Sequence, residues 1–427
     1  MRYNDTRLRI MIYKLKRKAQ WAINIYHLLK ARVACVYFGN PSHRLKVIGV
    51  TGTDGKTTTT HLIYHILKTC GYRVSMMSTV YARIGDTEYD TGLHMTTPDV
   101  WDVQKLLKKA ADHGDEYFVM ETTSHAFDQG RNWGIRYIVG AITNITHEHL
   151  DYHGTYAAYV RAKAQMIAQS RITLLNRDDD SYNELTKYVR NNTVKTYALH
   201  ENQADYHESL AKSLKMDLPE YNQYNYLLAY AVAQEVGVER DDILKALATF
   251  TLPKGRLEVA YSGDFVVIVD FAHTPHSIHQ LLSYMRGKTT KRLIHVFGSA
   301  GLRDGAKRPI MGYNSAEFAD VIIITEEDYR TEDPVQIARE IGIGIEKNGM
   351  RAVSAADLTP NLRRGYVFVQ SRDEAITKAI AMAAPGDIIL CTGKSHEKSL
   401  CRGEQEYDWD EFAAVKRALE SKPKTTT

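Results

Sequence analysis

The sequence has little of what holds a secreted or membrane-spanning protein together. Its four cysteines, in 427 residues, include no Cys-x-x-Cys pair, so a disulfide framework is excluded and a reducing compartment is favoured. No run of 18 apolar residues occurs, and the N-terminus lacks the uncharged apolar core of a signal peptide. With 27 glycines and 10 prolines the chain is neither collagen-like nor largely disordered. These absences predict a cytoplasmic globular protein.

Acidic residues are almost missing from the N-terminal segment. Residues 1–46 hold eleven Lys and Arg against Asp5 alone, a net charge of +10, whereas the whole chain carries +4. The rest is therefore acidic, and nucleic acid is not an expected partner. Apolar residues at helical spacing predict a long helix or helical hairpin over residues 7–34. We expect this helix either to pack on the central domain with its charges solvated, or to lie on an anionic membrane surface or grip substrate phosphates.

Short apolar strands alternate with amphipathic helices from residue 46 onwards. One series spans residues 46–257 and another residues 258–427, joined by the Pro- and Gly-containing stretch LPKGRLEVA (252–260). Strands that alternate with helices form parallel sheets. The sequence therefore predicts an α/β protein with a basic helical segment (1–45), a central P-loop-type ATPase domain and a smaller Rossmann-like C-terminal domain.

A phosphate-binding loop is indicated by GVTGTDGKTTTT (49–60), which lies between a predicted strand and a predicted helix. Its glycines let backbone N–H groups face the phosphates, and the helix N-terminus adds positive potential. Lys56 would reach the β- and γ-phosphates and the Thr57 hydroxyl would bind Mg²⁺. The usual spacing is broken because Val50 stands where the first glycine is expected, so an ordinary glycine turn is the alternative.

The variant TGTDGKTT resembles the ATP loop of the Mur ligase family. Later segments resemble the MurE-type branch in the same order, among them ETTSHAFDQGR (121–131), TNITHEHLDYHG (143–154), YVRAKAQMI (159–167), GSAGLRDGAKRP (298–309) and GKSHE (393–397). The resemblance covers residues 38–420. It implies an ATP-dependent acid–amino-acid ligase of cell-wall precursor synthesis that forms a peptide bond through an acyl phosphate. It also implies that the family's usual N-terminal UDP-binding domain is lacking.

The resemblance implies a set of nucleotide, metal and acceptor residues. The expected ATP contacts are Gly52, Thr53, Asp54, Gly55, Lys56, Thr57, Thr58, Asn222, Asn225, Arg256, Asp270 and His273. The expected catalytic residues are Lys56, Glu121, His149 and Lys163. Of these, Glu121 and His149 would hold Mg²⁺ together with Thr57, and Lys163 would hold a second ion as a carbamate. The expected acceptor contacts are Thr96, Thr97, Thr123 and Arg131.

Several of these residues have plainer interpretations. The histidines and carboxylates of residues 147–153 could be read as a zinc site, although phosphate chemistry with a hard metal explains them better. Lys163 could be a surface lysine, Asn222 and Asn225 could cap or solvate a helix, and Asp270 could cap a turn. The four cysteines are interpreted as packing residues.

The amino-acid substrate is expected at the C-terminal domain. The resemblance places it on Arg303, Glu327, Asp328, Arg330, Gly393 and Glu397. Two arginines suit carboxylates and Glu397 suits an ammonium group, which favours a diamino acid such as meso-diaminopimelate over lysine. The corresponding motif of the diaminopimelate type resembles Asp-Asn-Pro-Arg. In this sequence Asp328 and Tyr329 stand in place of the Asn-Pro pair.

Two other functions remain open from the sequence. One is a ligase of the same fold acting on another acceptor, of the folylpolyglutamate or amidating type. The other is a non-catalytic nucleotide-binding partner protein. In the ligase interpretation the partners are ATP, an amino acid and a muramoyl-peptide-like acceptor, and the chain is expected to be a monomer.

Overall fold

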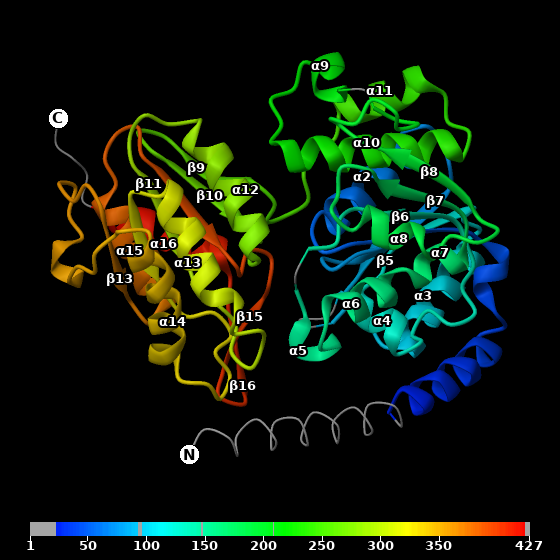
Figure 1. Ribbon diagram of the computed structural model, residues 1–427, viewed down its shortest axis with the longest axis horizontal. Helices are drawn as coiled ribbons and strands as arrows, with labels where there is room; N and C mark the ends of the chain where they lie inside the picture. The colour runs from blue at the N-terminus through cyan, green and yellow to red at the C-terminus, as the bar shows by residue number, and fades with distance from the viewer. Residues whose placement is uncertain (1–22, 93–95, 147, 208, 423–427) are drawn as a thin grey trace. The chain divides into compact units, whose positions relative to one another are not determined.

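The computed structural model describes residues 23–92, 96–146, 148–207 and 209–422, which form two compact units (Figure 1). The first unit takes its described residues from Met1–Ile145, Thr155–Met216 and Gln223–Phe250. The second takes its described residues from Thr146–Gly154, Asp217–Asn222 and Thr251–Thr427. Within these described ranges, no helix is both long enough and apolar enough to cross a membrane.

The first unit contains an eight-stranded sheet with the order β4-β3-β2-β5-β1-β6-β7-β8. Strands β2, β5, β1, β6, β7 and β8 pair in parallel, while β3 and β4 are added antiparallel at one edge. The central strands are buried along nearly their whole length, as expected where both faces of a parallel sheet are covered. The strands are β1 Lys46–Thr51, β2 Val74–Met77, β3 Ala82–Ile84, β4 Thr87–Tyr89, β5 Tyr117–Glu121, β6 Tyr137–Ile142, β7 Ser170–Asn176 and β8 Thr193–Tyr197.

Helices cover the strands of the first unit, and their ends follow local capping rules. In α3 the Asp99 carboxylate accepts a hydrogen bond from the Trp101 N–H (3.1 Å), and Gly114 ends the helix in the left-handed conformation. A further helix runs through residues 23–37. The others are η1 Pro41–Arg44, α2 Lys56–Thr69, α3 Val100–His113, α4 Ser124–Asp128, α6 Tyr156–Lys163, α7 Gln165–Gln169, α8 Tyr182–Thr186, α9 Leu210–Leu214, α10 Glu220–Glu235 and α11 Arg240–Ala248.

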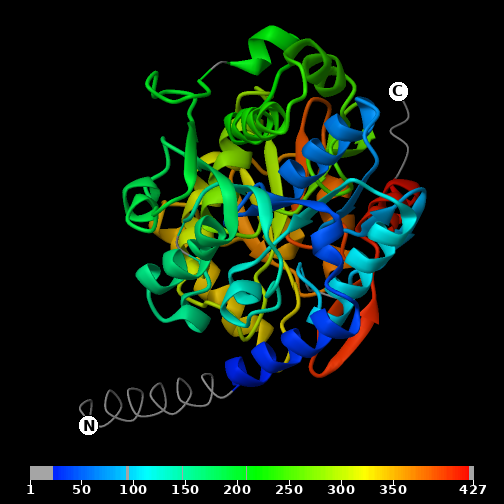
Figure 2. The same ribbon diagram turned by 90° about the vertical axis from the view of Figure 1, so that its right-hand side faces the viewer.

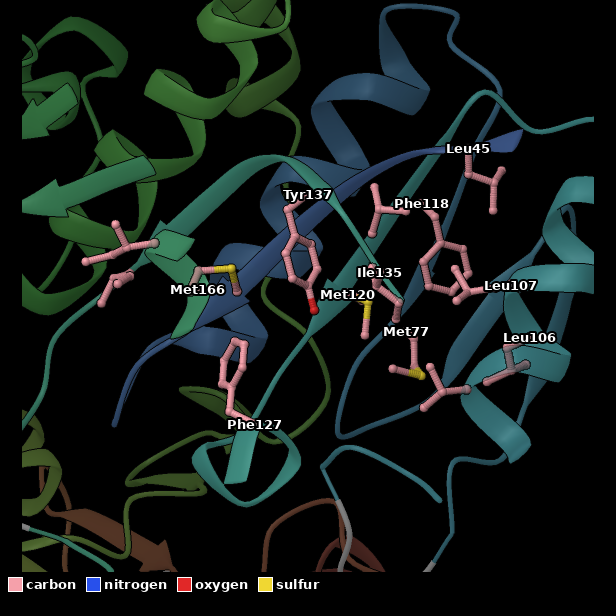
Figure 3. Packing of buried hydrophobic residues seen from close by; sticks show 14 of the residues in the cluster. Leu45, Met77, Leu106, Leu107, Phe118, Met120, Phe127, Ile135, Tyr137 and Met166 are labelled. Atoms are coloured by element: carbon pink, nitrogen blue, oxygen red, sulfur yellow. The ribbon is translucent and has the colours of Figure 1, made fainter. Parts of the chain in front are cut away.

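The core of the first unit lies against its central strands (Figure 3). Phe118 and Met120 of β5, Tyr137 of β6 and Met166 of α7 belong to one buried cluster, and none is more than 2% exposed. Burial of such side chains is the main free energy that stabilises the sheet. It fixes β1 between β5 and β6, so the loop that follows β1 opens at the carboxyl edge of the sheet.

The second unit has a six-stranded sheet with the order β13-β12-β11-β14-β10-β9, parallel except for β9. A two-stranded hairpin of β15 and β16 accompanies it. The strands are β9 Glu258–Ser262, β10 Val266–Asp270, β11 Leu293–Phe297, β12 Val321–Ile324, β13 Gly365–Phe368, β14 Ile388–Thr392, β15 Ser399–Arg402 and β16 Gln405–Asp408. The helices are α5 Leu150–His153, α12 Pro275–Arg286, α13 Lys307–Phe318, α14 Pro334–Lys347, η2 Ala355–Asp357, α15 Arg372–Met382 and α16 Glu411–Ser421.

The predicted α/β fold is confirmed, with corrections at the sheet edges. Strands β3, β4 and β9 pair antiparallel, and the sequence did not predict them as strands. Strands β2, β8, β13, β15 and β16 were also not predicted. Ala164 separates helices α6 and α7, which follow each other directly in the sequence. Of the helix expected at 7–34, the part before residue 23 lies outside the described residues.

Candidate active site

The glycine-rich loop of residues 52–55 joins β1 to α2. Gly52 and Gly55 have φ angles of 149° and 82°, which side-chain-bearing residues rarely adopt. A Cβ on Gly52 would lie 1.7 Å from Thr143 Oγ1, and one on Gly55 would lie 2.2 Å from Asn225 Oδ1. Only glycine therefore fits at either position. Gly55 immediately precedes α2, so the N-terminus of that helix faces the loop, as phosphate binding requires.

Lys56 and Thr57 occupy the first turn of α2. The Lys56 ammonium donates a hydrogen bond to the Thr53 carbonyl (2.7 Å), which holds it over its own loop. The Thr57 hydroxyl donates to Glu121 Oε2 (3.0 Å), and the Thr79 N–H donates to the same oxygen (3.0 Å). Thr57 and Glu121 meet because β5 lies beside β1, with Glu121 in register with the end of that strand.

The donor set at this point fits a magnesium ion. A threonine hydroxyl and a carboxylate are hard oxygen ligands, which Mg²⁺ combines with phosphate oxygens and water. Thr57 is 5% exposed and Glu121 is 1% exposed, so the pair is shielded from bulk solvent. Nowhere in the described ranges do three His, Cys, Asp or Glu side chains gather as a metal cluster.

Three residues that were not predicted from the sequence hold the glycine loop in place. Asn144 Oδ1 accepts from the Asp54 N–H (3.0 Å), and the Thr143 hydroxyl donates to the Asp54 carbonyl (2.6 Å). The Tyr159 hydroxyl lies 3.1 Å from the Thr53 hydroxyl. The sequence did contain a signal for these residues, because Thr143 and Asn144 begin the segment TNITHEHLDYHG and Tyr159 begins YVRAKAQMI.

Lys163 is the last residue of α6 and is buried, with 2% of its surface exposed. Its ammonium donates a hydrogen bond to the Gly52 carbonyl and lies 4.8 Å from the ring centroid of Tyr159. The surface-lysine interpretation is therefore wrong. The structure brings Lys163 to the phosphate loop, and its carbamylation stays a prediction.

The remaining predicted nucleotide and metal residues are divided between the two units. Thr58 is buried in the first turn of α2, and Asn225 Oδ1 accepts from the Thr59 hydroxyl (3.3 Å). Asn222 is buried and belongs to the second unit. His149 also belongs to the second unit and has a φ of 54°. Its place beside Glu121 stays a prediction.

Three of the four predicted acceptor residues contact one another next to Glu121. Thr97 Oγ1 donates to the Glu121 carbonyl (3.4 Å) and accepts from the Thr123 N–H (3.1 Å). Arg131 Nη1 donates to the Thr97 carbonyl (2.7 Å). Thr96 precedes this cluster and is half-buried. The segment before α3 and the start of α4 are thus fastened to the end of β5.

In the second unit Asp270 ends β10. Its carboxylate accepts hydrogen bonds from the Leu257 N–H (2.7 Å) and the Ala272 N–H (2.8 Å). Burial raises the pKa of this carboxyl, and the nearby Arg256 guanidinium opposes that rise. The turn-capping contact that the sequence analysis left open is present. Its predicted contact with ATP stays a prediction.

Arg256 and His273 lie around Phe271. The Arg256 guanidinium carbon is 4.7 Å from the centroid of the Phe271 ring, and His273 Nδ1 is 2.8 Å from the Phe271 carbonyl. His273 Nε2 and Lys307 Nζ both approach the buried Glu148 carboxylate, at 3.7 and 3.5 Å. Two basic side chains, Arg256 and Lys307, and the His273 ring therefore lie in this part of the second unit.

The two arginines expected for the amino-acid substrate come from neighbouring loops. Arg330 follows β12, has a φ of 53° and donates from Nη1 to the Gly301 carbonyl (2.8 Å). Arg303 is two residues beyond Gly301 and is exposed. Gly301 N–H donates to the Asp328 carbonyl (2.8 Å), which ties both loops together.

A buried lysine that the sequence analysis did not assign lies among the expected amino-acid residues. Lys394 has no exposed surface, and its ammonium lies 2.8 Å from Asp328 Oδ1 and 2.6 Å from Glu397 Oε2. Glu327 is 8% exposed and its Oε2 has no hydrogen-bond partner. A Cβ on Gly393 would lie 2.8 Å from that oxygen. Burial and the adjacent Asp328 raise the pKa of Glu327.

A glycine loop between a parallel strand and a helix, with a buried hydroxyl–carboxylate pair at its end, defines a P-loop ATP-dependent α/β enzyme. Comparison with known proteins shows the family of this enzyme. Residues 50–233 match the Mur ligase middle domain, and residues 255–395 match the Mur ligase, glutamate ligase domain. The chain belongs to the Mur ligase family, whose members are ATP-dependent amide-bond ligases that use Mg²⁺.

Similar proteins cover most of the chain. A UDP-N-acetylmuramoyl-L-alanyl-D-glutamate–2,6-diaminopimelate ligase of Geobacillus thermodenitrificans is 35% identical over 420 residues, covering 92% of this chain and 82% of its own. A UDP-N-acetylmuramyl-tripeptide synthetase of Roseiflexus is 36% identical over 424 residues, covering 91% and 81%. A solved structure of a 2,6-diaminopimelate ligase of the same kind has a TM-score of 0.57 at 28% identity, covering 88% and 78%.

Proposed function

We propose that this ligase adds a diamino acid, meso-diaminopimelate being the first choice, to a muramoyl-dipeptide-like acceptor at the expense of ATP. The single observation that carries the proposal is the buried Thr57–Glu121 pair beside the glycine loop, with the acceptor residues Thr97 and Arg131 fastened to the same strand end. The names of the similar proteins support the same substrates.

The chemistry assigns different tasks to the residues of the first unit. Backbone N–H groups of residues 52–57 and the start of α2 would bind the phosphates, and the Lys56 ammonium would leave the Thr53 carbonyl for a phosphate oxygen. Thr57 and Glu121 would hold Mg²⁺, which neutralises charge on the transferred phosphoryl group. The acceptor carboxylate would become an acyl phosphate, and the amine would displace phosphate to form the amide.

Lys163 is proposed to act as a carbamate. Carbon dioxide would add to the neutral amine with loss of a proton, so that a cation beside the Gly52 carbonyl becomes a carboxylate able to hold a second Mg²⁺. Its position supports this, because Lys163 is buried and its nitrogen lies at the Gly52 carbonyl of the phosphate loop. His149 is proposed as a further metal ligand, from the resemblance alone.

The amine is proposed to bind at the carboxyl edge of the second sheet. Arg330 and Arg303 would take its carboxylates, since a guanidinium can make two parallel hydrogen bonds to such a group. For the ammonium group we propose Glu327 and Glu397. Glu397 is already paired with Lys394, whereas Glu327 has a buried, unpaired oxygen next to Gly393. We therefore assign the larger share of ammonium binding to Glu327.

The location of the enzyme is also a proposal. We propose a cytoplasmic monomer that contacts the inner membrane surface peripherally through residues 1–46, because these residues carry a net charge of +10. A folate-type or amidating acceptor is the alternative substrate, and a non-catalytic nucleotide-binding role is the alternative function.

One experiment separates these possibilities. Purified protein with Mg²⁺ and ATP is given UDP-linked muramoyl dipeptide, and ADP release and the amide product are measured across a panel of amino acids. We expect diaminopimelate to give the largest kcat/KM. Product with a folate-type acceptor instead would replace the substrate assignment, and ATP binding without turnover on any acceptor would contradict the ligase proposal.

A further inference from the structure

The ammonium group of Lys394 joins two loops at the carboxyl edge of the second sheet. Lys394 follows β14 and Asp328 follows β12, and these two strands lie on either side of β11. The ammonium lies 2.8 Å from Asp328 Oδ1 and 2.6 Å from Glu397 Oε2. Burial opposes its charge, but the carboxylates of Glu397 and Asp328 outweigh burial and raise the pKa of Lys394. A charged lysine with no exposed surface therefore links the ends of two strands that do not pair with each other.

Asp328 connects this lysine to the backbone of Arg330. The Asp328 Oδ1 atom also accepts a hydrogen bond from the Cys401 N–H (3.0 Å), which belongs to the hairpin of β15 and β16. The same hairpin holds Arg330, because the Arg330 N–H donates to the Cys401 carbonyl (3.1 Å) and the Gly403 N–H donates to the Arg330 carbonyl (2.7 Å). Arg330 has a φ of 53°, a conformation that persists only where the surroundings fix it. These hydrogen bonds supply that restraint.

A role in stability alone does not explain three charged groups at this place. Buried ion pairs lose hydration energy, and apolar residues of similar size often stabilise a protein equally well. The three groups lie among the residues proposed to bind the amine, since Asp328 directly follows Glu327 in the sequence. Lys394 engages Asp328 and Glu397, whereas Glu327 Oε2 is buried without a hydrogen-bond partner. The geometry thus separates two carboxylates engaged by the protein from one that an ammonium ligand can engage.

We infer that Lys394 is a positioning residue for the amine substrate, because it holds Asp328 and Glu397 and, through Asp328, fixes the loop that presents Arg330. This inference rests on the amine site proposed above and deepens it. Asp328 stands where the related motif has asparagine. Its carboxylate then acts on the substrate through Arg330 and not by direct contact.

Steady-state kinetics of the full chain test the role in amine binding. The test variant is Lys394→Met, which keeps the length of the side chain and removes the ammonium. The matched control is Arg292→Met, because Arg292 is also buried and is paired with Asp387 (2.6 Å) just before β11 and β14 begin, at the opposite edge of the same sheet. We expect Lys394→Met to raise KM for diaminopimelate at least about tenfold while KM for ATP barely changes. Arg292→Met should leave both KM values as in the wild type.

Hydrogen–deuterium exchange tests the positioning itself and needs no turnover. The amides of Arg330, Cys401 and Gly403 all donate hydrogen bonds in the linked loops. We expect these amides to exchange at least about tenfold faster in Lys394→Met than in the wild type, because local opening becomes easier once the lysine is lost. In Arg292→Met their exchange should match the wild type.

Other results would overturn the inference. Unchanged exchange at these amides in Lys394→Met would exclude the link to Arg330. An equal rise in KM for diaminopimelate in both variants would assign Lys394 to stability of the unit alone. If circular dichroism shows that Lys394→Met is misfolded, Lys394→Gln takes its place. Failure of the wild type to use any amine would contradict the proposed function, whereas the exchange result would still support or overturn the link from Lys394 to Arg330.

Discussion

The Thr57 hydroxyl and the Glu121 carboxylate are joined by a 3.0 Å hydrogen bond that links the first turn of α2 to the end of β5. The Thr79 N–H donates to the same carboxylate oxygen, so Glu121 is oriented by two donors. Such orientation before substrate arrives lowers the reorganisation that catalysis would otherwise require. The pair therefore supports a metal-dependent phosphate site better than any single residue of the loop does.

Loss of the loop lysine should abolish most turnover. Lys56→Ala removes the positive charge that would stabilise the transferred phosphoryl group, and we expect kcat to fall at least about 10²-fold. ADP release in saturating Mg²⁺ measures this. Lys68→Ala, in the last turn of the same helix, is the control and should retain activity. Wild-type ADP release by Lys56→Ala would contradict the assigned mechanism.

Neutralising Glu121 should weaken magnesium binding without unfolding the protein. Glu121→Gln keeps an oxygen that can accept from Thr57 and Thr79 but removes the negative charge. We expect the Mg²⁺ concentration for half-maximal activity to rise at least about tenfold, because carboxylate charge supplies much of the affinity for Mg²⁺. The control is Glu116→Gln, an exposed carboxylate just before β5. An unchanged Mg²⁺ titration would remove Glu121 from the metal site.

Lys163→Ala should be inactive and partly restored by acetate. The variant lacks the amine that would carry the carbamate, and a short free carboxylate can occupy the space that is left. Arg161→Ala, an exposed residue of the same helix, should behave as wild type. Incorporation of ¹³C-labelled carbon dioxide, followed by NMR, tests the modification in the wild type. Failure to see a carbamate signal, together with no acetate rescue, would leave Lys163 as a bracing residue of the Gly52 carbonyl.

Much of this arrangement was predictable from the sequence, and the reasons differ by region. The central strands were predicted because β1, β5 and β6 are continuous apolar runs, and the glycine loop because its spacing has few other uses. Edge strands such as β3 and β9 were not predicted because segments of only three to five residues carry little periodicity. The braces from Thr143 and Asn144 required knowing that β6 lies beside β1. The helix of residues 23–37, the dark blue ribbon in Figure 2, was predicted from its apolar spacing, but which of its side chains are exposed depends on tertiary packing.

The Lys394 pair shows the same limit in the second unit. Glu397 was assigned to the substrate ammonium from its type and position, yet Lys394 already occupies it at 2.6 Å. The local sequence GKSHE does not predict that the lysine is buried between Asp328 and Glu397. Contacts between loops that follow different strands are fixed by the sheet order, which local sequence does not specify.

Removing Arg330 should affect the amine and not the nucleotide. Arg330→Ala removes a guanidinium proposed to bind a substrate carboxylate, and we expect KM for diaminopimelate to rise at least about tenfold while KM for ATP barely changes. Arg330→Lys should recover little, because an ammonium cannot make the paired hydrogen bonds. Arg339→Ala on α14 is the control. If lysine outperformed diaminopimelate tenfold as a substrate of the wild type, the assignment of the amine would be reversed.

Acidification should destabilise the second unit through His295. This imidazole is fully buried, stacks on Phe297 at a centroid distance of 4.4 Å, and lies between the Ser315 and Thr392 hydroxyls at 2.8 and 2.9 Å. Burial, with a smaller contribution from Arg372, lowers the pKa of His295 from 6.5 to about 3. The unfolded chain therefore binds a proton below pH 6.5 that the folded chain does not bind until about pH 3.

The free energy of unfolding should consequently fall as the pH drops below 6.5. A histidine of this kind should lower the free energy of unfolding by roughly 2 kcal/mol between pH 6.5 and pH 5, since uptake of one proton corresponds to about 1.4 kcal/mol per pH unit. His295→Gln lacks the group that takes up this proton. Its free energy of unfolding, measured by urea titration at several pH values, should therefore fall less steeply than that of the wild type as the pH drops. The difference between the two slopes should correspond to nearly one proton. His276→Gln, an exposed site in the same unit, should keep the wild-type slope. Equal slopes for His295→Gln and the wild type would mean that His295 is protonated in the folded protein at these pH values, against the neutral imidazole its burial requires.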